Sequence, residues 1–290
     1  MTGVAGDPRS AAASARRLGK RLSWGELGPR LGSAAVMMAA ALLTTVWGGI
    51  LFGLFWFAAA LIILREWQAL VGGPRGALPL SAGGLALGAS AVLAGASHLV
   101  GALASLVLGA LALAALASPA RRTMAAAGIL YAGVPLVALV VLRHATPFGT
   151  LAIFWLFAVV WGTDVMAFFG GRTIGGPKLS PRFSPSKTWS GFLIGILSGG
   201  LLGLLVVPSV ADKPRLLVLG LVAGALAQAG DLFESALKRR FGVKDSSALI
   251  PGHGGLMDRL DGFAAAACFA ACLGVVRHGV DAPGLGLFSW

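Results

Sequence analysis

The residues best suited to chemistry gather in one short polar stretch, residues 235–261, which lies between two long apolar runs. Only 12% of the chain is charged, yet this stretch alone holds Lys238, Arg239, Arg240, Lys244, Asp245, Asp258, Arg259 and Asp261. Cationic side chains bind phosphate groups, and carboxylates hold hard metal ions that also accept phosphate oxygens. The stretch therefore predicts a site where a phosphate-bearing substrate meets a metal ion.

A further acid, Asp231, closes the apolar run that precedes this stretch. If the helix predicted for that run continues, Asp231 is followed along one face by Glu234, Ser235 and Lys238. These residues would form a ladder of two carboxylates, a hydroxyl and an ammonium group. The spacing thus favours a helix that leads from the membrane directly into the site.

Asp258 and Asp261 stand three residues apart, just before the last apolar run. On the first turn of a helix their carboxylates would converge from one side, and the helix dipole favours negative charge there. Together with Asp231 they make a set of carboxylates without a Cys or His cluster, and Mg²⁺ is the first choice for such a set. The alternative is a carboxylate–arginine network, with Arg259 as the partner, that only holds helices together.

Residues 252–255 read Gly-His-Gly-Gly. Because three of these four residues lack side chains, the backbone amides of the turn can approach an anion closely. His253 is then either a proton donor or a residue that forms hydrogen bonds within the turn, and for a lone histidine the second role is the more ordinary one.

A second polar region, residues 161–191, places Asp164 near the end of an apolar run and Lys178, Arg182 and Lys187 in the loop that follows. An ionisable residue at membrane depth is costly, so it usually has a function or a partner. Three prolines in the loop predict an extended backbone. The cations of the loop either bind phosphate or only mark the cytoplasmic side of a membrane protein.

These regions belong to a chain of 290 residues, of which 57% are hydrophobic, with a mean hydropathy of +0.85. Such a composition excludes an ordinary soluble domain. Because a helix needs about 20 apolar residues to cross the bilayer, apolar runs of about this length identify the candidate membrane spans. The prediction is an all-α, polytopic integral membrane protein with about nine transmembrane helices. The candidate runs lie near residues 34–48, 49–64, 77–95, 98–118, 124–142, 149–168, 190–208, 215–233 and 262–279. The first two are divided only by Gly48 and Gly49 and could instead form one tilted helix.

Charge placement predicts the orientation, since cytoplasmic loops carry an excess of Lys and Arg. With the N-terminus inside, 19 of the 23 basic residues are cytoplasmic, and the others are Arg143, Lys213, Arg215 and Arg277. The net charge of +12 therefore faces anionic lipids and polyphosphates, and the sequence has no soluble basic domain that predicts nucleic-acid binding. We expect a basic cytoplasmic segment, residues 1–32, and a single transmembrane catalytic domain, residues 33–290, in which residues 160–262 carry the site.

The order of residues in both polar regions resembles that of phosphatidate cytidylyltransferases, also called CDP-diacylglycerol synthases. The C-terminal part of the resemblance is Ser235-x-x-Lys238-Arg239, then Lys244-Asp245, then His253-Gly254-Gly255-x-x-Asp258-Arg259-x-Asp261, with Gly230-Asp231-Leu232 before it. The upstream part is Asp164, Phe168, Gly170, Arg172, Lys178, Ser184-Pro185, Lys187-Thr188-Trp189 and Gly191. The N-terminal half agrees with this family only in hydropathy. Ser190, where many relatives carry an acid, and Val165-Met166, where Thr-Gly is more usual, are departures.

The resemblance implies an enzyme of phospholipid biosynthesis that makes CDP-diacylglycerol and pyrophosphate from CTP and phosphatidate. It implies Mg²⁺ bound by Asp231, Asp258, Asp261 and, less centrally, Asp164, and it allows a second, monovalent cation such as K⁺. The expected catalytic residues are Asp231, Asp258, Asp261, Lys238 and His253. The expected substrate-binding residues are Ser235, Arg239, Lys244, Arg259, Lys178, Lys187, Gly254 and Gly255. By family analogy we expect a homodimer among the lipids of a bacterial inner (plasma) membrane, with the N-terminus and the active site cytoplasmic.

Two other functions remain open from the residues alone. A related membrane enzyme could use CTP on another lipid, as a polyprenol kinase or an isoprenoid-lipid cytidylyltransferase does. An ion-coupled transporter could use Asp164 and Asp231 as an ion path, but charges that cluster at one membrane face disfavour a route across the bilayer.

Overall fold

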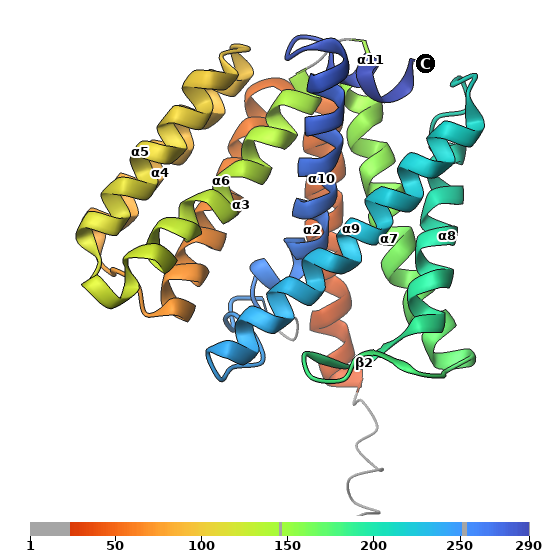
Figure 1. The fold of residues 1–290 in the computed structure, drawn as a ribbon, viewed down its shortest axis with the longest axis horizontal. Coiled ribbons are helices and arrows are strands. Elements are labelled where there is room, and N and C mark those ends of the chain that lie inside the picture. The colour runs from red at the N-terminus through yellow and green to blue at the C-terminus, as the bar shows by residue number, and fades with distance from the viewer. Residues whose placement is uncertain (1–23, 145–146, 251–253, 290) are drawn as a thin grey trace, which may run out of the picture.

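The computed structural model describes residues 24–144, 147–250 and 254–289, and within them the chain forms a helical bundle (Figure 1). In chain order the elements are α2 (Trp24–Trp47), α3 (Gly49–Val71), α4 (Ala77–Gly95), α5 (Leu99–Leu116), η1 (Pro119–Arg121), α6 (Arg122–His144), α7 (Gly149–Thr173), β1 (Lys178–Ser180), β2 (Ser184–Thr188), α8 (Trp189–Val206), α9 (Lys213–Arg240), α10 (Met257–His278) and α11 (Pro283–Phe288). The predicted all-α fold is confirmed. Within the described ranges, the antiparallel hairpin β1–β2 is the only sheet.

Eight of the described helices, α3 to α10, are long and apolar enough to cross a membrane. The helix before them, α2, is apolar over a shorter stretch, Gly32–Trp47. Each of the nine runs identified in the sequence therefore forms a helix. The chain is an integral membrane protein because these helices have the length and composition that a bilayer requires.

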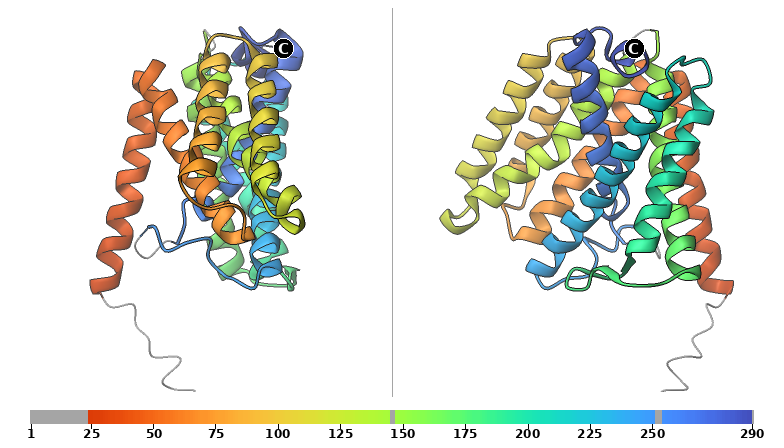
Figure 2. Two further views of the ribbon diagram at one scale, coloured as in Figure 1. Left: turned by 90° about the vertical axis from the view of Figure 1, so that its left-hand side faces the viewer. Right: turned by 45° about the vertical axis from the view of Figure 1, so that its right-hand side comes forward.

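The first apolar block is two helices, and the break between them has a local cause. Gly48 has a φ of 67°, which a helix cannot include and which glycine adopts without strain. Arg143, at the end of α6, donates a hydrogen bond from Nε to the carbonyl oxygen of Thr45 (2.8 Å), and its guanidinium fills the space that a Cβ at Gly48 would need. The arginine thus satisfies a carbonyl at the end of α2. The chain then reverses direction into α3 (Figure 2).

The central helix of the bundle is α10, which packs against α3, α6, α7, α9 and α11. The α4–α5 pair lies at one flank and the α7–α8 pair at the other (Figure 1). Helix α2 stands off from the bundle in the left view of Figure 2. The start of α2, the hairpin and the end of α9 lie at one end of the bundle, so the basic segments gather at the end that the charge pattern predicts to be cytoplasmic.

Helices α7 and α8 pack backbone against backbone. A Cβ at Gly191 would lie 2.6 Å from the carbonyl oxygen of Ala167, and one at Gly195 would lie 2.7 Å from that of Thr163. Small residues four apart allow this close approach in membrane helices. The pair forms a rigid wall that fixes Asp164, next to Thr163, relative to the hairpin at the start of α8.

Candidate active site

A cavity of about 1090 Å³ lies between α2, α3, α7, α9 and α10, with the hairpin at its rim. Its polar end is lined by Asp164, Arg172, Lys178, Lys187, Gln228, Asp231, Asp258, Arg259 and Asp261. Its other end is apolar and is lined by Met37, Met38, Phe55, Trp56, Ile62, Phe157, Trp161 and Phe263, among others. All four carboxylates predicted to hold a metal line the polar end, together with three of the predicted phosphate-binding cations.

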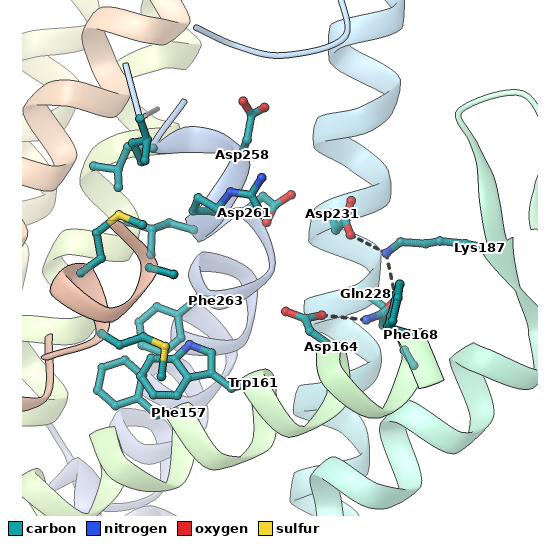
Figure 3. Close-up of a pocket in the computed structure, with 18 of the residues that line it drawn as sticks. Phe157, Trp161, Asp164, Phe168, Lys187, Gln228, Asp231, Asp258, Asp261 and Phe263 are labelled. Atoms are coloured by element: carbon teal, nitrogen blue, oxygen red, sulfur yellow. Dashed lines mark hydrogen bonds and ion pairs between the residues drawn. The ribbon is translucent and has the colours of Figure 1, made fainter. Parts of the chain in front are cut away.

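Two acids face each other where α9 crosses α10 (Figure 3). Asp231 follows Gly230, whose added Cβ would lie 2.7 Å from the backbone oxygen of Asp261, and Gly262, next to Asp261, lies as close to the backbone of Ala227. The two glycines let the helix backbones touch, because any side chain there would separate them. The Gly-Asp and Asp-Gly pairs therefore bring both carboxylates to one point of the cavity wall.

Lys187, on strand β2, crosses the rim of the cavity to α9. Its Nζ lies 2.5 Å from Oδ2 of Asp231 and donates to Oε1 of Gln228 (2.8 Å). The Nε2 of Gln228 in turn donates to Oδ1 of Asp164 (3.0 Å). A chain of contacts thus joins α7, the hairpin and α9, and it fixes the distance between Asp164 and Asp231 (Figure 3).

Lys238, two helical turns beyond Asp231 on α9, is buried between two carboxylates. Its Nζ lies 2.7 Å from Oε2 of Glu234 and 2.6 Å from Oδ1 of Asp258. Glu234 is only 1% exposed. These two ion pairs offset the cost of burying the Lys238 charge, whereas Oε1 of Glu234 has no hydrogen-bond partner among the described residues. The continued helix and its ladder are confirmed, since α9 extends to Arg240 and Ser235 Oγ donates to Asp231 Oδ1 (3.3 Å).

The glycine turn does enclose an anion, as the sequence suggested, but the described part of the turn encloses the protein's own carboxylates. The amide of Gly255 donates to Oδ2 of Asp258 (2.8 Å), and Ser246 donates to the same oxygen from its amide (3.0 Å) and its hydroxyl (3.1 Å). A Cβ at Gly255 would lie 2.7 Å from Oε1 of Glu66 on α3. A side chain at 255 would displace the Ser246 hydroxyl and the Glu66 carboxylate, which pack against this glycine.

The remaining predicted site residues do not line the cavity themselves or fall outside the described residues. Those that are described but not found among its lining residues are Ser235, Lys238, Arg239, Lys244, Gly254 and Gly255. Arg239 and Lys244 are exposed. His253 lies outside the described residues. The substrate-binding and catalytic roles expected of these residues stay predictions.

The carboxylates at the polar end fit a divalent cation in kind. Asp164, Asp231 and Asp261 offer oxygen ligands, which Mg²⁺ prefers. Among the described residues, no three His, Cys, Asp or Glu side chains stand close enough together to hold a metal ion. Asp231 is paired with Lys187, and the oxygens of Asp258 are engaged by Lys238, Ser246 and Gly255. The metal role of these aspartates therefore stays a prediction.

Two polar residues at or near the site did not stand out in the sequence as functional: Gln228 and Glu66. Gln228 lies three residues before Asp231, hence on the same helical face, and Glu66 lies two residues beyond the apolar run 49–64. The cost of placing polar groups in a membrane helix was the signal that could have identified both. Arg172, which belongs to the family resemblance but was not among the expected site residues, also lines the cavity.

Comparisons with known proteins show the family of the chain. The model of the cytidylyltransferase family matches residues 29–276. A protein of Brucella suis named phosphatidate cytidylyltransferase is 40% identical over 263 residues, which are 88% of this chain and 96% of the relative. One of Brucella abortus with the same name is 41% identical with the same coverage. One of Rickettsia bellii, also so named, is 39% identical over 143 residues, which are 46% of this chain and 62% of the relative.

Proposed function

Because the chain belongs to the cytidylyltransferase family, it is a nucleotidyltransferase, and we propose that it transfers the cytidylyl group of CTP to phosphatidate. The products are CDP-diacylglycerol and pyrophosphate. The observation that carries the proposal is the cavity, which has a charged end and an apolar end. Phosphatidate has the same division, with a phosphate monoester at one end and acyl chains at the other.

The reaction exchanges one phosphate–oxygen bond for another. An oxygen of the phosphatidate phosphate attacks the α-phosphorus of CTP, the bond from that phosphorus to the oxygen bridging to the β-phosphate breaks, and pyrophosphate leaves with the bonding electrons. Such a transfer needs two polyanions to be aligned and their charge to be neutralised, and it needs no covalent intermediate on the protein.

The cations of the polar end supply much of that neutralisation. Lys178 and Lys187 come from the hairpin, Arg172 from the end of α7 and Arg259 from the start of α10, so positive charge reaches the cavity from three sides. Arginine and lysine at these places bind phosphate oxygens by charge-assisted hydrogen bonds. The hairpin contributes both lysines and can therefore hold the triphosphate against the carboxylate-bearing helices.

A divalent cation fits the acids of the same end. Asp231 and Asp261, with Asp164 beside them and Asp258 at the start of α10, would hold Mg²⁺, which neutralises phosphate oxygens when bound. In the structure, Lys187 lies against Asp231 and so marks where a positive charge is stabilised between α9 and the hairpin. A monovalent cation at the site stays a prediction from family analogy.

The apolar end suits the acyl chains of the lipid. Four aromatic rings line it in a continuous stack: Trp56 on Phe263 (5.4 Å between ring centroids), Phe263 on Phe157 (5.0 Å) and Phe157 on Trp161 (4.6 Å). Opposite them, Met37 and Met38 come from α2. Burial of acyl chains against this surface is favourable at about 25 cal/mol per Å² of apolar area removed from water.

The placement of the basic segments supports a cytoplasmic orientation for the N-terminus and the site, in a bacterial inner (plasma) membrane. Phosphatidate would then be drawn from the membrane and CTP from the cytoplasm. A homodimer, expected by family analogy, stays a prediction that the molecular mass in detergent would test.

Pyrophosphate release by the purified full-length protein in detergent tests the function. We expect release that requires CTP, phosphatidate and Mg²⁺ together, with one CDP-diacylglycerol formed for each pyrophosphate. Pyrophosphate release without a lipid acceptor would indicate hydrolysis of CTP, and phosphorylation of a polyprenol with release of CDP would indicate a kinase; either result in place of CDP-diacylglycerol synthesis would reject the proposal.

A further inference from the structure

Glu66 is the buried acid of the N-terminal half whose contacts reach the catalytic region. It lies on α3, is 5% exposed, and does not line the cavity. Its Oε2 accepts a hydrogen bond from the amide of Met257 (2.7 Å), and its Oε1 accepts one from the amide of Leu256 (3.0 Å). These two amides belong to the start of α10.

The carboxylate of Glu66 supplies a cap that α10 does not make for itself. The N-cap residue of α10, Leu256, has no side-chain acceptor, and no side-chain hydrogen bond caps the helix from that position. The first amides of a helix have no partner within it and carry its positive dipole end, so an anion placed there is stabilised. Glu66 provides that anion from a segment about 190 residues away in the chain.

Glu66 also holds the segment that leads to α10. The hydroxyl of Ser247 donates to its Oε1 (2.6 Å). The hydroxyl of Ser246 lies between two acceptors, 3.4 Å from Oε2 of Glu66 and 3.1 Å from Oδ2 of Asp258, and its single proton serves one of them at a time. The amide of Ser246 also donates to Asp258, so the carboxylates from α3 and α10 meet at Ser246.

The first turn of α10 carries three residues that line the polar end of the cavity: Asp258, Arg259 and Asp261. Figure 3 labels the two aspartates. A displacement of this turn moves all three together. Misplacement of reacting groups by about 1 Å can reduce a rate about 100-fold. A residue outside the cavity that holds the start of α10 can therefore change the rate of the reaction.

We propose that Glu66 is a positioning residue for cytidylyl transfer, which acts by holding the start of α10 so that Arg259 and Asp261 face the substrates. The proposal rests on the proposed function. It assigns to the N-terminal half, in which the sequence predicted no site residue, one direct link to the reaction. Residues that orient metal ligands and catalytic groups typically change activity or metal affinity about 10- to 100-fold when they are replaced.

The test compares Glu66→Ala and Glu66→Gln with Gln68→Ala in the full-length protein. Gln68 is a matched control because it is on the same helix and is also buried (6% exposed), but it donates to the backbone oxygen of Ala125 on α6 instead of to α10. We expect kcat to fall roughly 10- to 100-fold for Glu66→Ala and less for Glu66→Gln, which keeps one acceptor oxygen. For Gln68→Ala we expect a lower unfolding temperature with kcat within about twofold of the wild-type value.

A second measurement does not depend on activity. Hydrogen exchange of the amides of Leu256 and Met257 should become at least about tenfold faster in Glu66→Ala, because both amides lose a buried acceptor. In Glu66→Gln, which keeps one acceptor oxygen, at least one of the two amides should exchange faster, and in Gln68→Ala both should be unchanged. Unchanged exchange, or a kcat loss in Gln68→Ala equal to that in the Glu66 variants, would overturn the proposal. A wild-type protein that does not turn over CTP and phosphatidate would reject the proposed function, and the exchange measurement would still decide whether Glu66 holds α10. If Glu66→Ala does not fold, Glu66→Gln decides.

Discussion

The two halves of the bundle place their polar side chains differently. From α7 to α10 these side chains turn toward the cavity, as Lys187 and Asp231 do. On α3 they turn toward the backbone of other helices: Trp67 donates to the carbonyl oxygen of Met124 (2.7 Å), Gln68 donates to that of Ala125, and Glu66 accepts from α10. The C-terminal half therefore carries the chemistry, and the N-terminal half supplies the frame that holds it.

This difference predicts two kinds of variant. Replacement of cavity-lining residues in the C-terminal half should lower turnover while the protein remains folded. Replacements on α3 should lower stability first, because they leave buried donors or acceptors without partners. Glu66 is the expected exception, since its partners belong to α10.

The largest effect should follow from Asp261→Asn. The change removes a negative charge from the point where α9 and α10 cross, with almost no change in shape, so we expect kcat to fall about 1,000-fold. Incorporation of labelled CMP into lipid measures the loss, and the unfolding temperature in detergent checks that the protein is folded. Near-normal synthesis would remove Asp261 from the catalytic set and would weaken the division between the two halves.

Gly262→Val should separate α9 from α10. The added Cβ would lie 2.8 Å from the carbonyl oxygen of Ala227, so the two helix backbones must move apart and Asp261 with them. We expect about 100-fold lower kcat together with a lower unfolding temperature. The control is Gly53→Ala on α3, where no atom lies within 4 Å of the added Cβ and activity should be unchanged. An active Gly262→Val protein would show that the close crossing is dispensable.

Lys187→Ala should have a smaller effect. The variant loses the contacts to Asp231 and Gln228 and one cation of the cavity, and we expect a roughly 10- to 30-fold lower kcat/KM for CTP. Lys213→Ala, at the opposite end of the bundle, should stay within about twofold of the wild-type value, because Lys213 contacts only loop carbonyl groups among its described hydrogen-bond partners. Equal losses in both variants would contradict the assignment of the polar end as the site.

Ser235→Ala should have the smallest effect. Its hydroxyl makes one long hydrogen bond, to Asp231, and the residue does not line the cavity. The net value of such a bond is about 1 kcal/mol, so we expect roughly a fivefold lower kcat at most. Steady-state kinetics with varied CTP would measure it. A loss as large as that of Asp261→Asn would place Ser235 in direct contact with substrate.

The nine long apolar helices, α2 to α10, and the position of each could be predicted from the sequence, because apolar length indicates membrane spans directly. The short helices η1 and α11 were not predicted, since they have no such length. The ends of the helices were less accurate. Helices α7 and α9 run on to Thr173 and Arg240 because polar residues continue a helix without adding apolar length. The hairpin β1–β2 was expected only as an extended loop, since its prolines indicate extended backbone but do not specify a partner strand.

The acids and several cations of the site could also be predicted, because they lie in two short regions with recognisable spacing. The pairing of Glu66 with Leu256 and Met257 could not, since nothing in a single sequence indicates which residues about 190 positions apart will meet. The role of Ser190 could not be predicted either. Its hydroxyl contacts Thr188 and donates a hydrogen bond to the backbone oxygen of Gly175. An ionised acid at this position could not donate the bond to Gly175.

The central claim is that the α-phosphorus of CTP is transferred to phosphatidate at the polar end of the cavity. It is tested most directly by following CTP labelled at the α- or the γ-phosphorus through the purified protein with phosphatidate and Mg²⁺. We predict that the α-label appears in CDP-diacylglycerol and the γ-label in pyrophosphate, and that Asp261→Asn abolishes both. Transfer of the γ-label to lipid would identify a kinase instead and would contradict the account.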